Sequence, residues 1–255
     1  MTLLNRLLFV IVLTGFSCLF AQVNIEKFRQ DQEKIGFAGK FGVDFSFKSG
    51  NSNVTQIGAN GRLNYNGGVF YSFLVFKGDY GRNNGREFSN DALLHWRTVC
   101  SVGEQVQAEA FAQIDYNKAR LLLFRDLLGG GLRLKLYKSD GLKTRWGVGG
   151  FGEQERYNLP SDAVHPQRLT TVRASTYVSN EITLTGYVTL TSIIYYQPAL
   201  RTLRDYRILS ENIFAVDLGK YIDLNITVDL RHDNVPPDGK KLTDVNSRCG
   251  VAVKF

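Results

Sequence analysis

The chain has 255 residues, of which 44% are hydrophobic and 22% charged, and its formal net charge is +7. This hydrophobic content, with 12% aromatic residues, excludes an intrinsically disordered protein. After residue 21 no run approaches the ~18 consecutive apolar residues of a spanning helix, which excludes a helical membrane protein. Lys and Arg alternate with acidic and apolar residues instead of forming runs, so we expect no nucleic-acid partner.

The first segment, residues 1–21, has the layout of a secretory signal peptide. Arg6 supplies a positive charge, an apolar run follows from Leu7 to Leu13, and Ala21 offers a cleavage site. We therefore expect an exported protein. The next segment, residues 22–35, is polar and charged, and we interpret it as a periplasmic N-terminal arm.

From residue 36 to the C-terminus the sequence has a period of two, which is typical of strands with two chemically different faces. The clearest case is IDLNITVDLR at residues 222–231. The pattern predicts about twelve strands, each long enough to cross a bilayer when tilted. Their expected spans are 36–48, 54–66, 69–80, 87–99, 104–117, 127–138, 144–156, 167–178, 181–196, 205–217, 220–233 and 243–255.

The connections between these strands differ at the two ends. Short turns are expected at 67–68, 101–103, 139–143, 179–180 and 218–219, and longer loops at 81–86, 157–166, 197–204 and 234–242, with 49–53 as a short exception. Outer-membrane barrels have this asymmetry because their long loops face outside. The sequence therefore predicts an all-β, transmembrane, antiparallel up-and-down β-barrel over residues 36–255. We expect about 12 strands (roughly 10–14), with short periplasmic turns and longer extracellular loops.

Aromatic residues of outward parity form two expected membrane-interface girdles. Phe37, Tyr65, Trp96, Trp146 and Phe255 fall near the short turns, and Phe47, Phe88, Tyr116, Tyr196 and Tyr206 near the long loops. The alternative is a soluble periplasmic lipid-binding β-barrel, whose apolar parity would face inward. Such a barrel needs no aromatic residues at its strand ends, so we favour the cell outer membrane.

Charged residues of inward parity carry both signs. They are Lys40, Asp44, Arg62, Arg97, Glu109, Asp115, Arg133, Lys135, Glu153, Arg173, Glu211, Asp223, Asp229, Arg231 and Arg248. They allow either a porin-like pore with charged rings or a plug of paired side chains. Because the two signs nearly balance, and Phe111, Phe151, Tyr177 and Tyr187 are expected to point inward, we favour a narrow or closed channel, or a structural envelope protein, over a general porin.

His95 is the natural candidate for a general base, because it has inward parity beside Arg97. A lipid-modifying outer-membrane enzyme is therefore the alternative, but no nucleophile motif accompanies His95 and we expect no enzyme. The spacing of His, Cys, Asp and Glu indicates no metal site, and no cofactor is expected. The glycines at 129–131 and 147–152 lack the Gly-Lys-Ser/Thr of a phosphate loop and are interpreted as sites where strands approach closely.

Three stretches carry a family resemblance: Lys48–Asn53, Arg120–Leu132 and Tyr195–Arg207. With them, the chain resembles an uncharacterised outer-membrane family, domain of unknown function 481, whose members are often labelled salt-induced outer membrane proteins. The resemblance implies the outer membrane of a Gram-negative bacterium, with outer-membrane lipid and lipopolysaccharide around the barrel. The aromatic C-terminus, Phe255, is the feature that barrel assembly machinery recognises in this class. The resemblance implies no activity, and the oligomeric state stays open.

Overall fold

The computed structural model describes residues 35–50, 53–219 and 222–253. The expected signal peptide, all but the last residue of the expected arm, and Phe255 lie outside them. The strands are β1 (Gly36–Lys48), β2 (Val54–Asn66), β3 (Phe70–Asn83), β4 (Arg86–Ser101), β5 (Val106–Asn117), β6 (Leu122–Lys138), β7 (Leu142–Tyr157), β8 (Arg168–Thr185), β9 (Val188–Pro198), β10 (Tyr206–Asp217), β11 (Ile222–Asp233) and β12 (Thr243–Val253). A 3-10 turn, η2 (Lys118–Arg120), joins β5 to β6.

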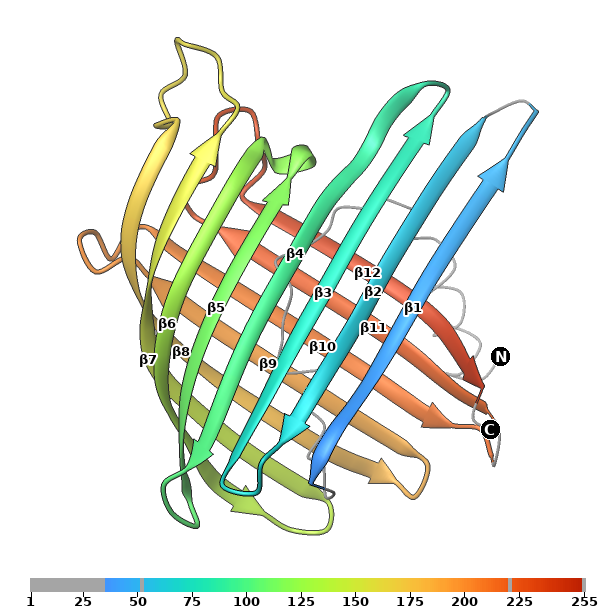
Figure 1. Ribbon diagram of the computed structural model, residues 1–255, viewed down its shortest axis with the longest axis vertical. Helices are drawn as coiled ribbons and strands as arrows, with labels where there is room; N and C mark the ends of the chain where they lie inside the picture. The colour runs from blue at the N-terminus through green and yellow to red at the C-terminus, as the bar shows by residue number, and fades with distance from the viewer. Residues whose placement is uncertain (1–34, 51–52, 220–221, 254–255) are drawn as a thin grey trace, which may run out of the picture.

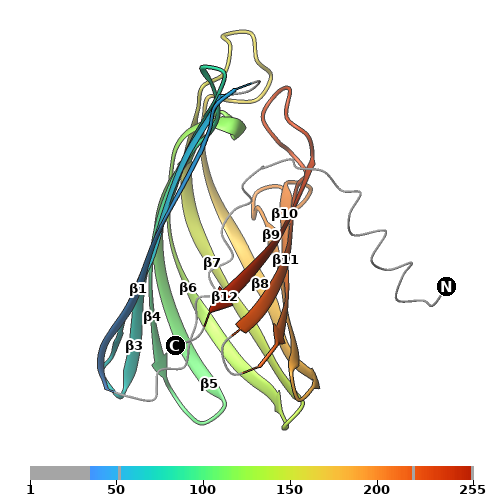
Figure 2. The same ribbon diagram turned by 90° about the vertical axis from the view of Figure 1, so that its right-hand side faces the viewer.

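The strands form one antiparallel sheet in chain order from β1 to β12. Figures 1 and 2 show that the sheet curls, so that β1–β5 face β8–β12 across an interior. The predicted all-β, antiparallel up-and-down architecture is confirmed. Within the described ranges the sheet order begins with β1 and ends with β12. The same residues contain no helix long and apolar enough to span a membrane.

The curled sheet has an apolar outer face and a charged interior. Phe41 and Leu128 are 71% and 67% exposed on the outside. Arg125 and Arg207 are 1% and 2% exposed on the inside, and they are among the largest fully buried side chains. This distribution is the reverse of that in a soluble protein, in which charged side chains are almost never fully buried.

Two of the expected connections are wrong. The β8–β9 turn is at Gly186 and Tyr187, because Ser179 is buried within β8 and Asn180 accepts a hydrogen bond from Thr144 of β7. Tyr187 is therefore exposed in a turn and does not point inward. The expected long loop at 81–86 is a tight two-residue turn, since Asn84 and Gly85 both have positive φ (47° and 79°), which suits a hairpin.

The longest connections, at 158–167, 199–205 and 234–242, all lie at the end of the sheet where β1 finishes, which we call the loop end. The connections at the opposite end, the turn end, are short, as at 67–69 and 139–141. The predicted asymmetry is therefore present in the second half of the chain.

The glycine-rich segments of β6 and β7 lie opposite each other. Gly131 pairs with Gly149, and Gly130 with Gly150. A Cβ on Gly131 would lie 2.5 Å from the backbone oxygen of Val148. These glycines permit a backbone contact that no side chain fits, in agreement with their interpretation as close-approach sites.

Candidate functional site in the interior of the sheet

Arg207 of β10 is the centre of a buried group of charges near the loop end. Its guanidinium donates to both carboxylate oxygens of Glu153 at 3.1 Å and to both of Glu155 at 3.0 Å. Its Nε donates to Asp233 at 2.9 Å. Glu153 and Glu155 belong to β7, which is separated from β10 in the sheet by β8 and β9. The hydrogen bonds from Arg207 to Glu153 and Glu155 therefore cross the interior.

Two further arginines extend this group. Arg173 of β8 donates to Glu153 at 2.6 Å and binds Asp205 with two nitrogens, at 2.9 and 3.2 Å. Arg125 of β6 lies 2.9 Å from Asp115. We use the name ionic cluster for the set Arg125, Arg173, Arg207, Glu153, Glu155 and Asp233, all of which are buried.

The ionic cluster satisfies the main physical requirement for buried charge. Removing an ion from water costs several kcal/mol, and only close partners with good geometry offset that cost. Each member has at least one opposite charge within 4 Å. Two-pronged contacts such as that between Arg173 and Asp205 also fix the orientation of the side chains. The members of the cluster are thus joined by ion pairs within the interior.

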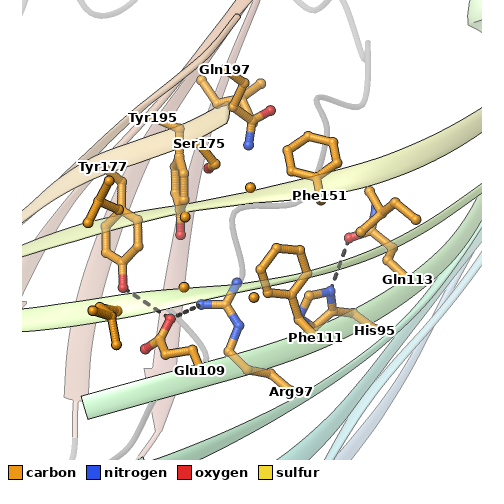
Figure 3. A pocket seen from close by; sticks show the side chains of 18 residues that line it. His95, Arg97, Glu109, Phe111, Gln113, Phe151, Ser175, Tyr177, Tyr195 and Gln197 are labelled. Atoms are coloured by element: carbon orange, nitrogen blue, oxygen red, sulfur yellow. Dashed lines mark hydrogen bonds and ion pairs between the residues drawn. The ribbon is translucent and has the colours of Figure 1, made fainter. Parts of the chain in front are cut away.

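Nearer the turn end than the ionic cluster, the interior contains a cavity of about 680 Å³, counting the space open to solvent (Figure 3). Aromatic rings of Phe111, Phe151, Tyr177 and Tyr195 line it. Glu109 also lines the cavity and accepts hydrogen bonds from Arg97 and from the Tyr177 hydroxyl, both at 3.3 Å. The Tyr177 contact joins β8 to β5, which are not neighbours in the sheet.

His95 lies on this cavity and is 2% exposed. Its Nδ1 is 3.1 Å from the side-chain oxygen of Gln113, whose amide nitrogen donates to Asp115 at 2.8 Å. The rings of Phe73 and Phe111 flank it. The contact at Nδ1 of the ring is therefore with an amide.

Two polar atoms on the cavity, Nε2 of His95 and Oε1 of Gln197, are buried with no hydrogen-bond partner within the described part of the chain. Buried polar groups of this kind are commonly satisfied by ordered water. The cavity therefore suits water or a small polar solute. The same part of the chain contains no group of three His, Cys, Asp or Glu side chains that could hold a metal ion.

The structure buries most of the charged residues expected in the interior. Arg97, Glu109, Arg133, Glu153, Arg173, Glu211, Asp229 and Arg231 are buried, and Arg62 and Asp115 are half-buried. The side chains of Lys40, Asp44, Asp223 and Arg248 lie outside the described set. Lys135 is exposed, and its amine donates to the backbone of Glu104.

Sequence reasoning missed four members of the ionic cluster: Arg125, Glu155, Arg207 and Asp233. Glu155 and Arg207 share the parity of residues that were selected on the same strands, Glu153 and Glu211, so a full count of each strand would have found them. Arg125 was missed because β6 begins at Leu122, five residues before its expected start.

The expected girdle residues that the structure describes, all except Phe255, lie on the outer face. Phe37, Phe47, Phe88, Trp96, Tyr116, Trp146 and Tyr196 are exposed, and Tyr65 and Tyr206 are half-buried. The indole nitrogens of Trp96 and Trp146 donate to Ser72 and Thr176 at 3.0 and 2.8 Å. An exposed ring with its N–H bound is the arrangement that suits a membrane interface.

The molecule is thus a curled antiparallel sheet with an apolar exterior and an ion-paired interior. The chain belongs to the family described as protein of unknown function, DUF481, whose model matches residues 40–255. The resemblance to that family is confirmed, whereas induction by salt stays a prediction. No curated protein matches the sequence.

Three of the solved structures that are similar to this chain are the following. One is a NanC porin, 9% identical, covering 85% of this chain and 99% of that chain with a TM-score of 0.48. Another is the translocator domain of the autotransporter NalP from Neisseria meningitidis, 12% identical, with coverages of 88% and 90% and a TM-score of 0.43. A bacterial polysaccharide outer membrane secretin is 8% identical, with coverages of 85% and 89% and a TM-score of 0.42.

Proposed function

We propose that this protein is an integral outer-membrane β-barrel of a Gram-negative bacterium, exported by a cleaved signal peptide. In this proposal β1 closes against β12, the loop end faces outside, and lipid and lipopolysaccharide surround the apolar face. Barrel assembly machinery acts on the C-terminal strand. The support is the combination of an apolar exterior, a polar interior and aromatic residues near the strand ends.

The proposed lumen is narrow or closed, and the ionic cluster is the single observation that carries this part of the proposal. Arg207 bridges β10 to β7, and the Tyr177 hydroxyl bridges β8 to β5, so side chains meet across the interior. A water-filled porin holds its interior charges apart. The protein then serves either as a selective narrow channel or as a structural component of the envelope.

Conductance of the purified full-length protein in planar lipid bilayers tests this proposal. We expect no large, stable, weakly selective conductance, because the paired side chains occupy the lumen. The variant Arg207→Ala removes the guanidinium at the centre of the ionic cluster and is expected to raise the conductance. The matched control Arg62→Ala changes an arginine of β2 outside the ionic cluster and is expected to leave the conductance unchanged. A large conductance of the wild type would contradict the proposal.

Membrane insertion has a separate test, since the chain contains two tryptophans and both are exposed. In vesicles containing brominated lipids, we expect strong quenching of Trp96 and Trp146 fluorescence by bromines near the headgroups. Quenching that is absent, or recovery of the mature chain in the periplasm without detergent, would favour the soluble lipid-binding barrel. The charged interior disfavours that alternative, because an acyl chain needs an apolar cavity.

Catalysis is not part of the proposal. The competing function is lipid modification with His95 as the general base, and its best support is that the Nε2 atom is buried without a partner. Assays of the purified protein on phospholipid and lipopolysaccharide, with His95→Ala as the comparison, separate the two. We expect no hydrolysis or acyl transfer, and activity that disappears in the variant would establish the enzyme instead.

A further inference from the structure

Two further cavities lie at the loop end, away from the cavity that His95 lines. They have volumes of about 600 and 420 Å³, counting the space open to solvent. Both are lined by Arg120, Lys240, Lys241 and Asp244, so we treat them as one site and call it the mouth cavity. Figures 1 and 2 show η2, which carries Arg120, beside the β11–β12 connection, which carries the two lysines.

Local hydrogen bonds hold the backbone around the mouth cavity. The Asn117 side chain accepts from the backbone N–H of Arg120 at 3.0 Å and caps η2. Across the cavity, the backbone N–H of Lys240 donates to Pro237 at 3.0 Å. The connection that carries Lys240 is tied to the neighbouring β7–β8 connection, because the N–H of His165 donates to Asp238 at 2.7 Å. These hydrogen bonds therefore hold the backbone to which the cationic side chains are attached.

The charges around the mouth cavity are predominantly positive. Arg120, Lys240 and Lys241 line the larger part, with Asp244 as the one acidic lining residue. Glu155 and Asp233 line the smaller part, but both accept hydrogen bonds from Arg207. Their charge is compensated within the ionic cluster and does little to offset the cations at the mouth.

Arg120 itself lies in an unfavourable environment for a cation. Burial, together with the positive charges of Arg231 and Arg125, lowers the pKa of its guanidinium well below the usual value. The positive charges of Arg231 and Arg125, which contribute to this lowering, favour an anion placed next to Arg120. An arginine and two lysines on facing segments provide the forked and the single-point donors with which proteins bind phosphate.

We propose that the mouth cavity binds a phosphate-type oxyanion between η2 and the β11–β12 connection, with Arg120, Lys240 and Lys241 as its ligands. The group is either a free solute or a phosphate of lipopolysaccharide, since both present the same oxygen atoms. Binding does not require an open lumen, so it stands whether or not the channel proposal holds. Which side of the membrane the cavity faces rests on the proposed topology.

Equilibrium dialysis of the full-length protein in a neutral detergent, with radiolabelled inorganic phosphate, tests the site. The variant Lys240→Gln/Lys241→Gln changes two residues of a surface loop and is expected to weaken binding at least tenfold, because it removes two charge-assisted contacts to the oxyanion. The matched control is Arg201→Gln/Arg204→Gln, which removes the same charge from an exposed connection at the same end of the sheet. Its affinity should stay within about twofold of the wild type, because those arginines do not line the cavity.

A second arm of the experiment replaces inorganic phosphate by lipopolysaccharide with and without its phosphates. Loss of inorganic phosphate binding in the lysine variant alone supports a free solute as the ligand. Binding only to the phosphorylated lipopolysaccharide, lost in the same variant, supports the lipid source. Equal affinities of the wild type, the lysine variant and the arginine control for both probes would overturn the proposal. The unboiled mobility of each variant on a gel confirms that it is folded.

Discussion

Two regions of the interior use arginine differently. On β2, Arg62 donates to Asn64 of its own strand and to the Tyr71 hydroxyl of the adjacent strand β3, and its guanidinium lies over the ring of Phe73. On β10, Arg207 reaches past two intervening strands to the carboxylates of β7. Arg62 is half-buried, whereas Arg207 is 2% exposed.

This difference shows how a charged side chain in the interior constrains the fold. A contact between adjacent strands adds to a pairing that the backbone already makes, so it constrains the interior little. A contact across the interior holds together strands that the backbone does not join. We infer that the ionic cluster sets the width of the interior on the β7–β10 side, and that the β2–β3 side depends mainly on backbone hydrogen bonds.

The most direct test of this comparison is to remove each arginine in turn. Arg207→Ala removes the partner that the buried Glu153, Glu155 and Asp233 share, and removing one member of a buried ion pair costs about 3–5 kcal/mol. Arg62→Ala removes a half-buried side chain and should cost about 1 kcal/mol or less. Urea unfolding of the two variants in lipid vesicles measures the difference.

Arg207→Lys sharpens the same test. It keeps the charge but loses the fork that binds two carboxylates at once, so its free energy of unfolding should fall between those of the wild type and Arg207→Ala. If Arg62→Ala and Arg207→Ala lower the free energy of unfolding equally, contacts across the interior stabilise the fold no more than contacts between adjacent strands.

A smaller effect is expected from the glycines where β6 meets β7, beside the ionic cluster. Gly131→Ala places a methyl group 2.5 Å from a backbone oxygen that cannot move without disturbing the strand pairing. We expect a loss of about 1–3 kcal/mol, as for overpacking in a core. Gly152→Ala on β7 is the matched control, because nothing lies within 4 Å of its new methyl group. Its free energy of unfolding should change by less than about 0.5 kcal/mol in the same urea titration.

The sequence predicted the strands well where alternation was clean, and poorly where it was interrupted. The alternation of residues 222–231 marked most of β11, whose observed bounds are Ile222–Asp233. The turn expected at Ser179 and Asn180 was wrong because turn-forming residue types also serve inside a strand when their side chains find partners. The Asn180 side chain does so by accepting from Thr144. Composition alone does not distinguish these two uses.

The candidate site was predictable in its residue types but not in its partners. Parity placed Glu153 and Arg173 in the interior, and both are buried there. Which charges meet depends on how far the sheet curls, and that is a property of the whole set of strands. The approach of Tyr177 to Glu109, 68 residues away in the chain, therefore has no local signal in the sequence.

A further comparison concerns two tyrosine hydroxyls, one in each region. Tyr177→Phe removes a hydrogen bond to the buried carboxylate of Glu109 across the interior, and hydrogen bonds to charged groups contribute about 1.5–3 kcal/mol. Tyr71→Phe removes contacts with Arg62 and Asn64 between adjacent strands. Because Tyr71 is half-buried, water replaces part of what is lost, and we expect a cost of about 0.5–1 kcal/mol. If the urea titrations reverse this order, the contacts between adjacent strands stabilise the sheet more than those across the interior, and the lumen is wider in solution than the ionic cluster implies.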